Sequence, residues 1–205
     1  MSTNNLMFIK KEDGFKKQEV GSNPITYHVK NEQHISVVFL LFHSNLNVTI
    51  DLEDENSSCD IKVLYLIKQK EKMDIQVKIN HIKGETTSSQ IIKGIILDEA
   101  QVNFVGKIYI APNAQKSDGH QNHRAVLLSN EGRVTSTPEL EIYADDVKCS
   151  HGSATGPLEQ ESIFYLMSRG ISKKEAERIL LHSFINDIIP NEYQTITDEW
   201  INQHV

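Results

Sequence analysis

The sequence predicts a mainly β protein with a small α-helical segment at its C-terminal end. Apolar and polar residues alternate with period two through most of residues 23–156, as in strands that bury one face. After residue 156 the apolar spacing changes to the 3.6-residue period of helices. We therefore expect an irregular lead-in over residues 1–22, a β core over 23–156 and a helical segment over 157–205.

The bulk composition is that of one ordinary globular domain. The chain has 205 residues, a formal net charge of −7 and a sequence pI of 5.7. It lacks the basic cluster that nucleic-acid binding requires, so we expect no nucleic-acid partner. No stretch approaches the ~20 apolar residues of a membrane span, so no membrane partner is expected. Cys59 and Cys149 make no disulfide framework, which favours reduced thiols in a cytoplasmic protein.

The β core contains one continuous apolar run and several alternating segments. Val37 to Phe42 is apolar throughout, which predicts a strand buried on both faces. The other expected strands are marked by Leu46, Val48 and Ile50; by Ile61, Val63, Tyr65 and Ile67; by Ile75, Val77 and Ile79; by Ile95 to Leu97; by Val102 and Phe104; by Ile108 and Ile110; by Val126 to Leu128; and by Leu140 and Ile142.

The pattern by itself leaves two architectures open. Parallel sheets normally need helical crossovers, and none interrupts the β core, which favours a sandwich of antiparallel sheets. Tight hairpin signals are few, however, and polar stretches such as His81 to Gln90 and Ala111 to Arg124 separate the apolar pieces. Short strands joined by polar corners are also typical of a parallel β-helix, in which each coil stacks on the next.

The helical segment begins after Gly156-Pro157. Gly170 is placed to end the first helix, and Ser172 with Glu175 forms the capping box of the second, which we expect Pro190 to end. The apolar faces are marked by Ile163, Leu166 and Met167 in the first helix and by Ala176, Ile179, Leu180 and Phe184 in the second, and a third short helix is expected around Asp198 to Gln203.

From His81 to about Ile189 the sequence resembles the SufB/SufD family. The most specific segment is Pro138 to Gly152, PELEIYADDVKCSHG, and Phe164 to Ile171, FYLMSRGI, supports it. Further matching pieces are HIKGETTS from His81, IILD from Ile95, GKIYI from Gly106, Ala114-Gln115, Gln121 with Arg124, and Leu127 to Ser129. The matches run in order over roughly half of the chain.

The resemblance implies a right-handed parallel β-helix followed by a small C-terminal α-helical segment, which resolves the choice left open by the pattern. It also implies a scaffold role in iron–sulfur cluster assembly rather than an enzymatic one. Members of the family pair through their β-helices, so the implied partner is a second copy of this chain or a SufB-like chain. Their C-terminal helices bind a SufC-like ABC ATPase.

The subtype is inferred from two positions. SufB-type chains carry a scaffold cysteine shortly after the Leu-Leu segment, where this chain has Gly132. They also carry Glu-His-Glu where this chain has Cys149, Ser150 and His151, which is similar to the SufD pattern. Full-length SufD proteins are about twice as long and begin with a helical domain. The resemblance therefore identifies a shortened, SufD-like chain that lacks the N-terminal helical domain.

Cys149 and His151 are the first candidate site. Their spacing of two puts both side chains on one face of a strand. Thiolate and imidazole ligands suit iron, zinc or the edge of an iron–sulfur cluster. Two ligands are too few for a closed site, so the resemblance implies a transient iron or iron–sulfur cluster at a dimer interface, with a partner supplying the rest. The alternative is a buried cysteine and a hydrogen-bonded histidine with structural roles only.

Two weaker sets of residues complete the candidates. His120 and His123 have a spacing seen in metal sites, but they fall in an expected polar loop or turn, which favours a structural role. The exposed residues of the helical segment would form the ATPase-docking surface, or the helices could simply cap the open end of the solenoid. The docking candidates are Tyr165, Arg169, Lys173, Lys174, Glu177 and Arg178.

A second function stays open at this point. The chain could be a free-standing β-helix homodimer that serves as a binding or structural module without cluster assembly. A carbohydrate-active β-helix enzyme is disfavoured because the sequence shows no group of carboxylates placed to converge on one groove.

Overall fold

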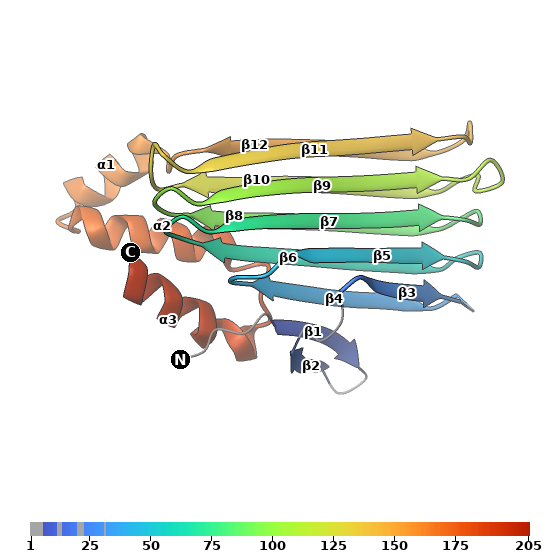
Figure 1. Ribbon diagram of the computed structural model, residues 1–205, viewed down its shortest axis with the longest axis horizontal. Coiled ribbons are helices and arrows are strands. Elements are labelled where there is room, and N and C mark those ends of the chain that lie inside the picture. The colour runs from blue at the N-terminus through green and yellow to red at the C-terminus, as the bar shows by residue number, and fades with distance from the viewer. Residues whose placement is uncertain (1–5, 12–13, 20–22, 31) are drawn as a thin grey trace.

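The computed structural model describes residues 6–11, 14–19, 23–30 and 32–205. Two sheets lie face to face as the two walls of a parallel β-solenoid, and three α-helices lie along one side of it (Figure 1). The prediction of a mainly β solenoid with a C-terminal helical segment is confirmed, and the sandwich of antiparallel sheets is wrong.

The strands alternate between the two sheets along the chain. Sheet A has the order β12-β10-β8-β6-β4-β1-β2, and sheet B has the order β11-β9-β7-β5-β3. Their bounds are β1 (Leu6–Lys11), β2 (Gly14–Glu19), β3 (Ile25–Val29), β4 (His34–Leu41), β5 (Leu46–Leu52), β6 (Ser58–Ile67), β7 (Lys72–His81), β8 (Thr87–Ile96), β9 (Gln101–Ile110), β10 (Asp118–Leu127), β11 (Arg133–Ile142) and β12 (Lys148–Gly156).

Each coil contributes one strand to each sheet, which explains how parallel strands pair without helical crossovers. After each strand the chain turns into the opposite sheet, so the parallel neighbour belongs to the next coil. In sheet A, Ser58 pairs with Thr87, Thr87 with Asp118, and Asp118 with Lys148. Equivalent positions of successive coils therefore stack in columns, and the last coil, β11 with β12, ends the stack.

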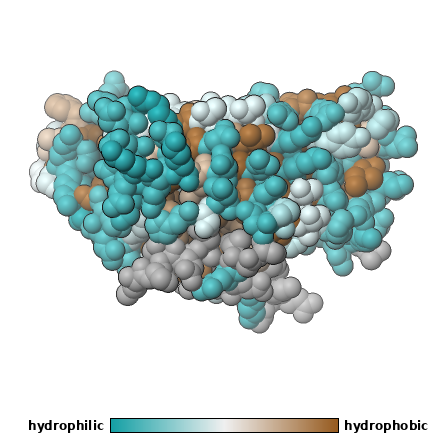
Figure 2. Space-filling model, in the orientation of Figure 1, coloured by the Kyte–Doolittle hydropathy of each residue, from teal (hydrophilic) through white to brown (hydrophobic). Residues whose placement is uncertain are grey.

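Both faces of sheet A are buried over its middle, whereas sheet B has one face in water. Val37, Phe39 and Leu41 point into the solenoid, and Val38 and Leu40 join an outer cluster that packs against the helices. The predicted double burial of this run is confirmed. The outer positions of β7 are mostly exposed, and Figure 2 shows this side of the molecule as mainly hydrophilic.

The N-terminal segment differs from the expected irregular lead-in. Strands β1 and β2 pair antiparallel, and β1 continues sheet A by pairing with β4, with Leu6 opposite Leu40. The edge of β4 carries backbone groups that need partners, and a pairing strand satisfies them without a local sequence signal. Residues 1–5, 12–13 and 20–22 of the expected lead-in lie outside the described residues.

The helices are α1 (Gln160–Ser168), α2 (Lys173–Ile185) and α3 (Gln194–His204), with a short 3-10 turn at Asn191–Tyr193 before α3. The predicted capping box is present in part, since Ser172 Oγ accepts a hydrogen bond from the Glu175 amide at 3.2 Å. Gly170 has a positive φ of 86°, the left-handed conformation expected of a C′ glycine. No helix of the described residues is long and apolar enough to cross a membrane.

Three details of the helix predictions are wrong. Met167 was expected on the apolar face of α1 but is 45% exposed. Helix α2 ends at Ile185, before the expected Pro190. Ile179 was expected on the buried stripe but is 38% exposed, whereas Leu181 is fully buried. The buried side of α2 differs from the predicted one because the helix packs on sheet A beside α1 and α3. Tertiary packing, and not the local apolar spacing, decides which side of the helix faces the sheet.

Candidate functional site

Cys149 and His151 lie on β12, in the terminal coil of the solenoid. Cys149 packs against the interior cluster that contains Ile108 and Ala144, so its side chain points inward. Two residues beyond His151, Ser153 Oγ donates a hydrogen bond to Ser136 Oγ of β11 at 2.9 Å, across the interior. Because side chains alternate along a strand, His151 faces the same interior as these two neighbours.

The terminal coil leaves this interior open at one end. Strands β11 and β12 are the last strands of their sheets. Cys149 is therefore only half-buried, and His151 is exposed although it points inward. The structure places a thiol and an imidazole on the rim of a solenoid end that a second molecule could cover.

The electrostatic surroundings keep the Cys149 thiol protonated in the isolated chain. Partial burial raises its pKa, the negative charge of Asp118 raises it further, and a backbone hydrogen bond at Ser150 lowers it by less. A metal ion would have to displace this proton to bind sulfur, because the thiolate is the ligand form. Among the described residues, neither Cys149 nor His151 belongs to a group of three clustered metal-ligand side chains.

The interior beneath the open end contains two hydrogen-bonded histidines. His81 contacts Thr86 Oγ1 through Nδ1 and Ser88 Oγ through Nε2, both at 2.8 Å. His123 contacts Tyr65 Oη through Nε2 at 2.8 Å and is stacked on a neighbouring aromatic ring. Burial lowers the pKa of each histidine to about 4. Both rings are neutral near pH 7 and fully engaged, as expected of structural histidines.

The structure does not bring His120 and His123 together. They lie on strand β10, not in the predicted loop or turn, and a spacing of three puts them on opposite faces. His120 is on the outer face, where its ring contacts Ser150 Oγ at 2.6 Å and Asp118 Oδ1 at 2.7 Å. His123 is inside the solenoid. The expectation of a metal site shared by these two histidines is corrected by this geometry.

The candidate docking residues divide into exposed and engaged side chains. Tyr165 is 56% exposed, with the Arg169 guanidinium 4.9 Å from its ring centroid. Lys174 is exposed, and Lys173 forms an ion pair with Glu177 at 3.7 Å. Arg178 instead donates to the Asn202 carbonyl at 2.9 Å and so joins α2 to α3. The structure thus leaves Arg178 least available to a partner.

A groove of about 540 Å³ lies between α1 and α2. Its apolar lining includes Tyr165, Leu166 and Ile179, and Glu159 and Glu161 add acidic groups at one end. Beside it, Phe164 is 74% exposed and Met167 is 45% exposed. Sequence reasoning missed Phe164 as a surface residue, although its place off the apolar stripe of α1 was a usable signal.

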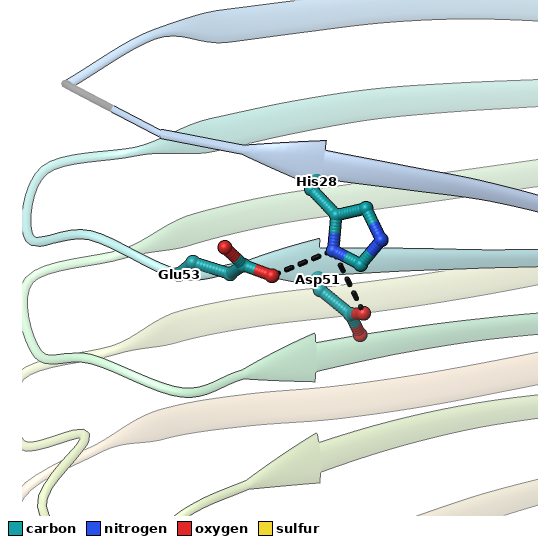
Figure 3. Close-up of side chains that lie close together, drawn as sticks. All are labelled: His28, Asp51 and Glu53. Carbon is teal, nitrogen blue, oxygen red and sulfur yellow. Dashed lines mark hydrogen bonds and ion pairs between the residues drawn. The ribbon is translucent and has the colours of Figure 1, made fainter.

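A histidine and two carboxylates cluster on the outer face of sheet B, far from these candidates in the sequence (Figure 3). His28 Nδ1 lies 2.6 Å from Glu53 Oε1 and 3.4 Å from Asp51 Oδ2. Lys30 Nζ pairs with the other oxygen of Glu53 at 2.9 Å. The lysine already neutralises much of the charge, so the cluster is best described as a surface ion-pair network. The sequence held no signal for it.

The chain matches the family model described as "SUF system FeS cluster assembly, SufBD core domain" over residues 23–184. It is 34% identical over 193 residues to "Iron-sulfur cluster assembly protein SufD" of Escherichia coli, covering 89% of this chain and 45% of that protein. It is 32% identical over 148 residues to an iron-sulfur cluster assembly SufBD family protein of Synechocystis, covering 71% and 32% respectively. It is also 30% identical over 142 residues to SufD of Bacillus subtilis, covering 69% and 32%.

The aligned region is therefore less than half the length of each of these relatives. The family match over residues 23–184 includes the parallel coils from β3 to β12, with Cys149 and His151, and most of α2. The family model matches more than half of the chain, and the relative from Escherichia coli is 34% identical over 89% of it. The chain therefore belongs to the SufBD family of iron–sulfur cluster assembly proteins.

Proposed function

We propose that this chain is a SufD-type scaffold subunit that works in the cytoplasm with a SufC-type ATPase and a SufB-type partner. It performs no bond chemistry itself. Its tasks are to hold the ATPase through the C-terminal helices and to contribute Cys149 and His151 to a site where iron or a growing cluster is held. A second copy of the chain is the other candidate for the partner position.

One observation carries the proposal: an inward-facing thiol and imidazole lie at the uncovered end of the solenoid in a SufBD protein. The two ligands suit iron, either as a single ion or as part of a cluster, and they leave ligand positions for a partner. The same end presents apolar surface, since Ile142 is 39% exposed and Tyr143 is 56% exposed. An end-to-end contact would bury this surface together with the two candidate ligands.

The docking surface is supported by the groove between α1 and α2. It combines exposed aromatic and aliphatic side chains with charged groups at its margin, the composition typical of protein interfaces. It lies between α1 and α2, and Figure 1 shows these two helices near one end of the strands.

Anaerobic reconstitution with ferrous iron and sulfide, in the presence of the partner chains, tests the ligand assignment. The wild-type complex should take up iron and sulfide, and the Cys149→Ala/His151→Ala variant should take up markedly less. His120→Ala is the matched control, because His120 is an exposed histidine on the outer face of the same sheet. Equal uptake by all three forms would remove Cys149 and His151 from the proposed function.

Co-purification under reducing conditions tests the partners. Co-expression with a SufC-type ATPase and a SufB-type chain should give one complex that contains all three. Recovery of the chain only as a homodimer, with no retention of the ATPase, would support the binding-module alternative instead.

A further inference from the structure

Three inward-facing side chains form a polar column that ends at the open rim. Gln90 of β8 is in register with Gln121 of β10, and Gln121 is in register with His151 of β12. Neighbouring parallel strands are about 4.8 Å apart, so each side chain lies directly beneath the next along the solenoid axis. In the preceding coil the same column is occupied by Ile61, which is fully buried.

The amide of Gln121 is buried without satisfying its hydrogen-bonding capacity. The residue is 3% exposed, and both Nε2 and Oε1 are without a hydrogen-bond partner within the described part of the chain. Gln90 differs, because its Nε2 donates to the Lys107 carbonyl at 3.5 Å and only its Oε1 is unpartnered. A buried amide without hydrogen-bond partners destabilises the folded state, so an apolar side chain would stabilise this position better.

The opposite wall of the solenoid leaves room for this amide. Gly106 of β9 lies across the interior from β10, and a Cβ atom at position 106 would come within 2.6 Å of Gln121 Oε1. A residue with a side chain here would displace the amide. The amide therefore extends across the interior, held by the walls of the solenoid and not by hydrogen bonds.

We propose that Gln121 is a positioning residue for His151: its Oε1 accepts the ring N–H of His151 when the other ring nitrogen binds a metal ion. This inference rests on the proposed function of His151 as a ligand. A metal-bound histidine almost always donates its second ring N–H to an acceptor, which fixes the orientation of the ring. Gln121 offers a buried acceptor in the adjacent coil, on the same face and in register, and no described residue donates a hydrogen bond to it.

A purely structural role predicts the opposite response to substitution. Gln121→Met keeps the side-chain volume and removes the unsatisfied amide, so the fold should be as stable as before or more stable. A positioning role predicts instead that the same variant binds metal more weakly. Gln90→Met is the matched control, since Gln90 is one coil further from His151 in the same column.

The experiment measures Zn²⁺ and anaerobic Fe²⁺ affinity, together with melting temperature, for the chain with the partner that covers its open end. Gln121→Met should weaken metal binding by about 10–100-fold, the range typical of lost outer-shell partners. Gln90→Met should bind as the wild type does. Gln121→Glu, which keeps an acceptor at the same place, should restore most of the affinity. Neither methionine variant should melt at a lower temperature.

The outcomes separate this inference from the proposed function. No metal binding by the wild type, or equal binding by wild type and His151→Ala, would overturn the assignment of His151 and this inference with it. Wild-type affinity in Gln121→Met, beside lost affinity in His151→Ala, would overturn this inference alone. Equal losses in Gln121→Met and Gln90→Met would also overturn it, because they would indicate a general effect of interior polarity.

Discussion

Gly94 of β8 faces the ring of Tyr65 so closely that no side chain fits between them: a Cβ atom at position 94 would lie 2.5 Å from Tyr65 Oη. The two residues are paired in register on neighbouring coils. Tyr65 is fully buried, and its hydroxyl is hydrogen-bonded to His123. The ring therefore has no free space into which it could move.

We predict that Gly94→Ala destabilises the protein by about 1–3 kcal/mol, as overpacking of a tight core does. Chemical denaturation of the wild type and the variant measures the loss. The same substitution is then made in a Tyr65→Leu protein, which lacks the ring and its hydroxyl. In that protein Gly94→Ala should lower the free energy of unfolding by much less. An equal cost in both backgrounds would show that the ring is not the cause.

His81 should make stability depend on pH. Burial lowers its pKa to about 4 in the folded chain, against an ordinary value of 6.5. Below about pH 6.5 the unfolded chain binds a proton that the folded chain does not, so stability falls as the pH drops towards 4. Well above about pH 6.5 His81 is neutral in both the folded and the unfolded chain, so it does not make stability depend on pH. By about pH 5 the loss from this one residue should approach about 2 kcal/mol.

The measurement compares unfolding free energies at about pH 7.5 and pH 5 for the wild type and His81→Gln. The variant should lose less stability than the wild type on acidification. His123 is present in both proteins and contributes equally, so the difference isolates His81. Parallel pH profiles for the two proteins would show that His81 is not buried as a neutral ring.

Lys93 fastens the end of α2 to sheet A. Its Nζ donates to the Phe184 carbonyl at 2.7 Å and to Asp187 Oδ1 at 2.5 Å, and it lies 5.1 Å from the Phe184 ring centroid. Partial burial raises the pKa of Asp187, but the hydrogen bond from Lys93 and the positive charges of Lys93 and Lys62 together outweigh it, so the pKa is lowered. A cation near the last carbonyls of a helix is favourable.

Lys93→Met should therefore lower stability by about 1–3 kcal/mol and speed amide hydrogen exchange in the last turn of α2. Lys148→Met is the control, because Lys148 is an exposed lysine of β12. Hydrogen exchange followed by mass spectrometry measures the protection of α2 and of β12 separately. Unchanged protection of α2 in the Lys93 variant would mean that apolar packing alone holds the helix in place.

The groove between α1 and α2 should decide ATPase binding. Tyr165→Ser combined with Ile179→Ser removes two exposed apolar side chains from its lining. We expect the affinity for a SufC-type ATPase to fall at least 10-fold, with a change in stability within about 0.5 kcal/mol. Tyr143→Ser is the matched control, since Tyr143 has the same 56% exposure as Tyr165 but follows β11 and does not line the groove. Equal loss from both changes would contradict a docking site in the groove.

Local patterns predicted much of the fold. The alternation of Ile61, Val63 and Tyr65 gave the inward face of β6, and the unbroken run from Val37 to Phe42 gave a strand buried on both faces. Capping by Ser172 marked the start of α2. These features depend on neighbouring residues only, and the periods of strands and helices follow from backbone geometry.

The same patterns failed where a contact joins different coils. The choice between a sandwich and a solenoid depended on strand order, which alternation does not encode. The exposure of Ile179 followed from how α2 packs on sheet A. The group of His28, Asp51 and Glu53 was also missed, because β3 and β5 bring it together.

The sequence by itself determined the face of β12 on which Cys149 and His151 lie, because a spacing of two always shares a face in a strand. Only the tertiary structure decided that this face is the interior of an open terminal coil and that Gln121 lies beneath His151. The reason is physical: alternation is a property of one strand, whereas the register between coils depends on the length of every turn that separates them.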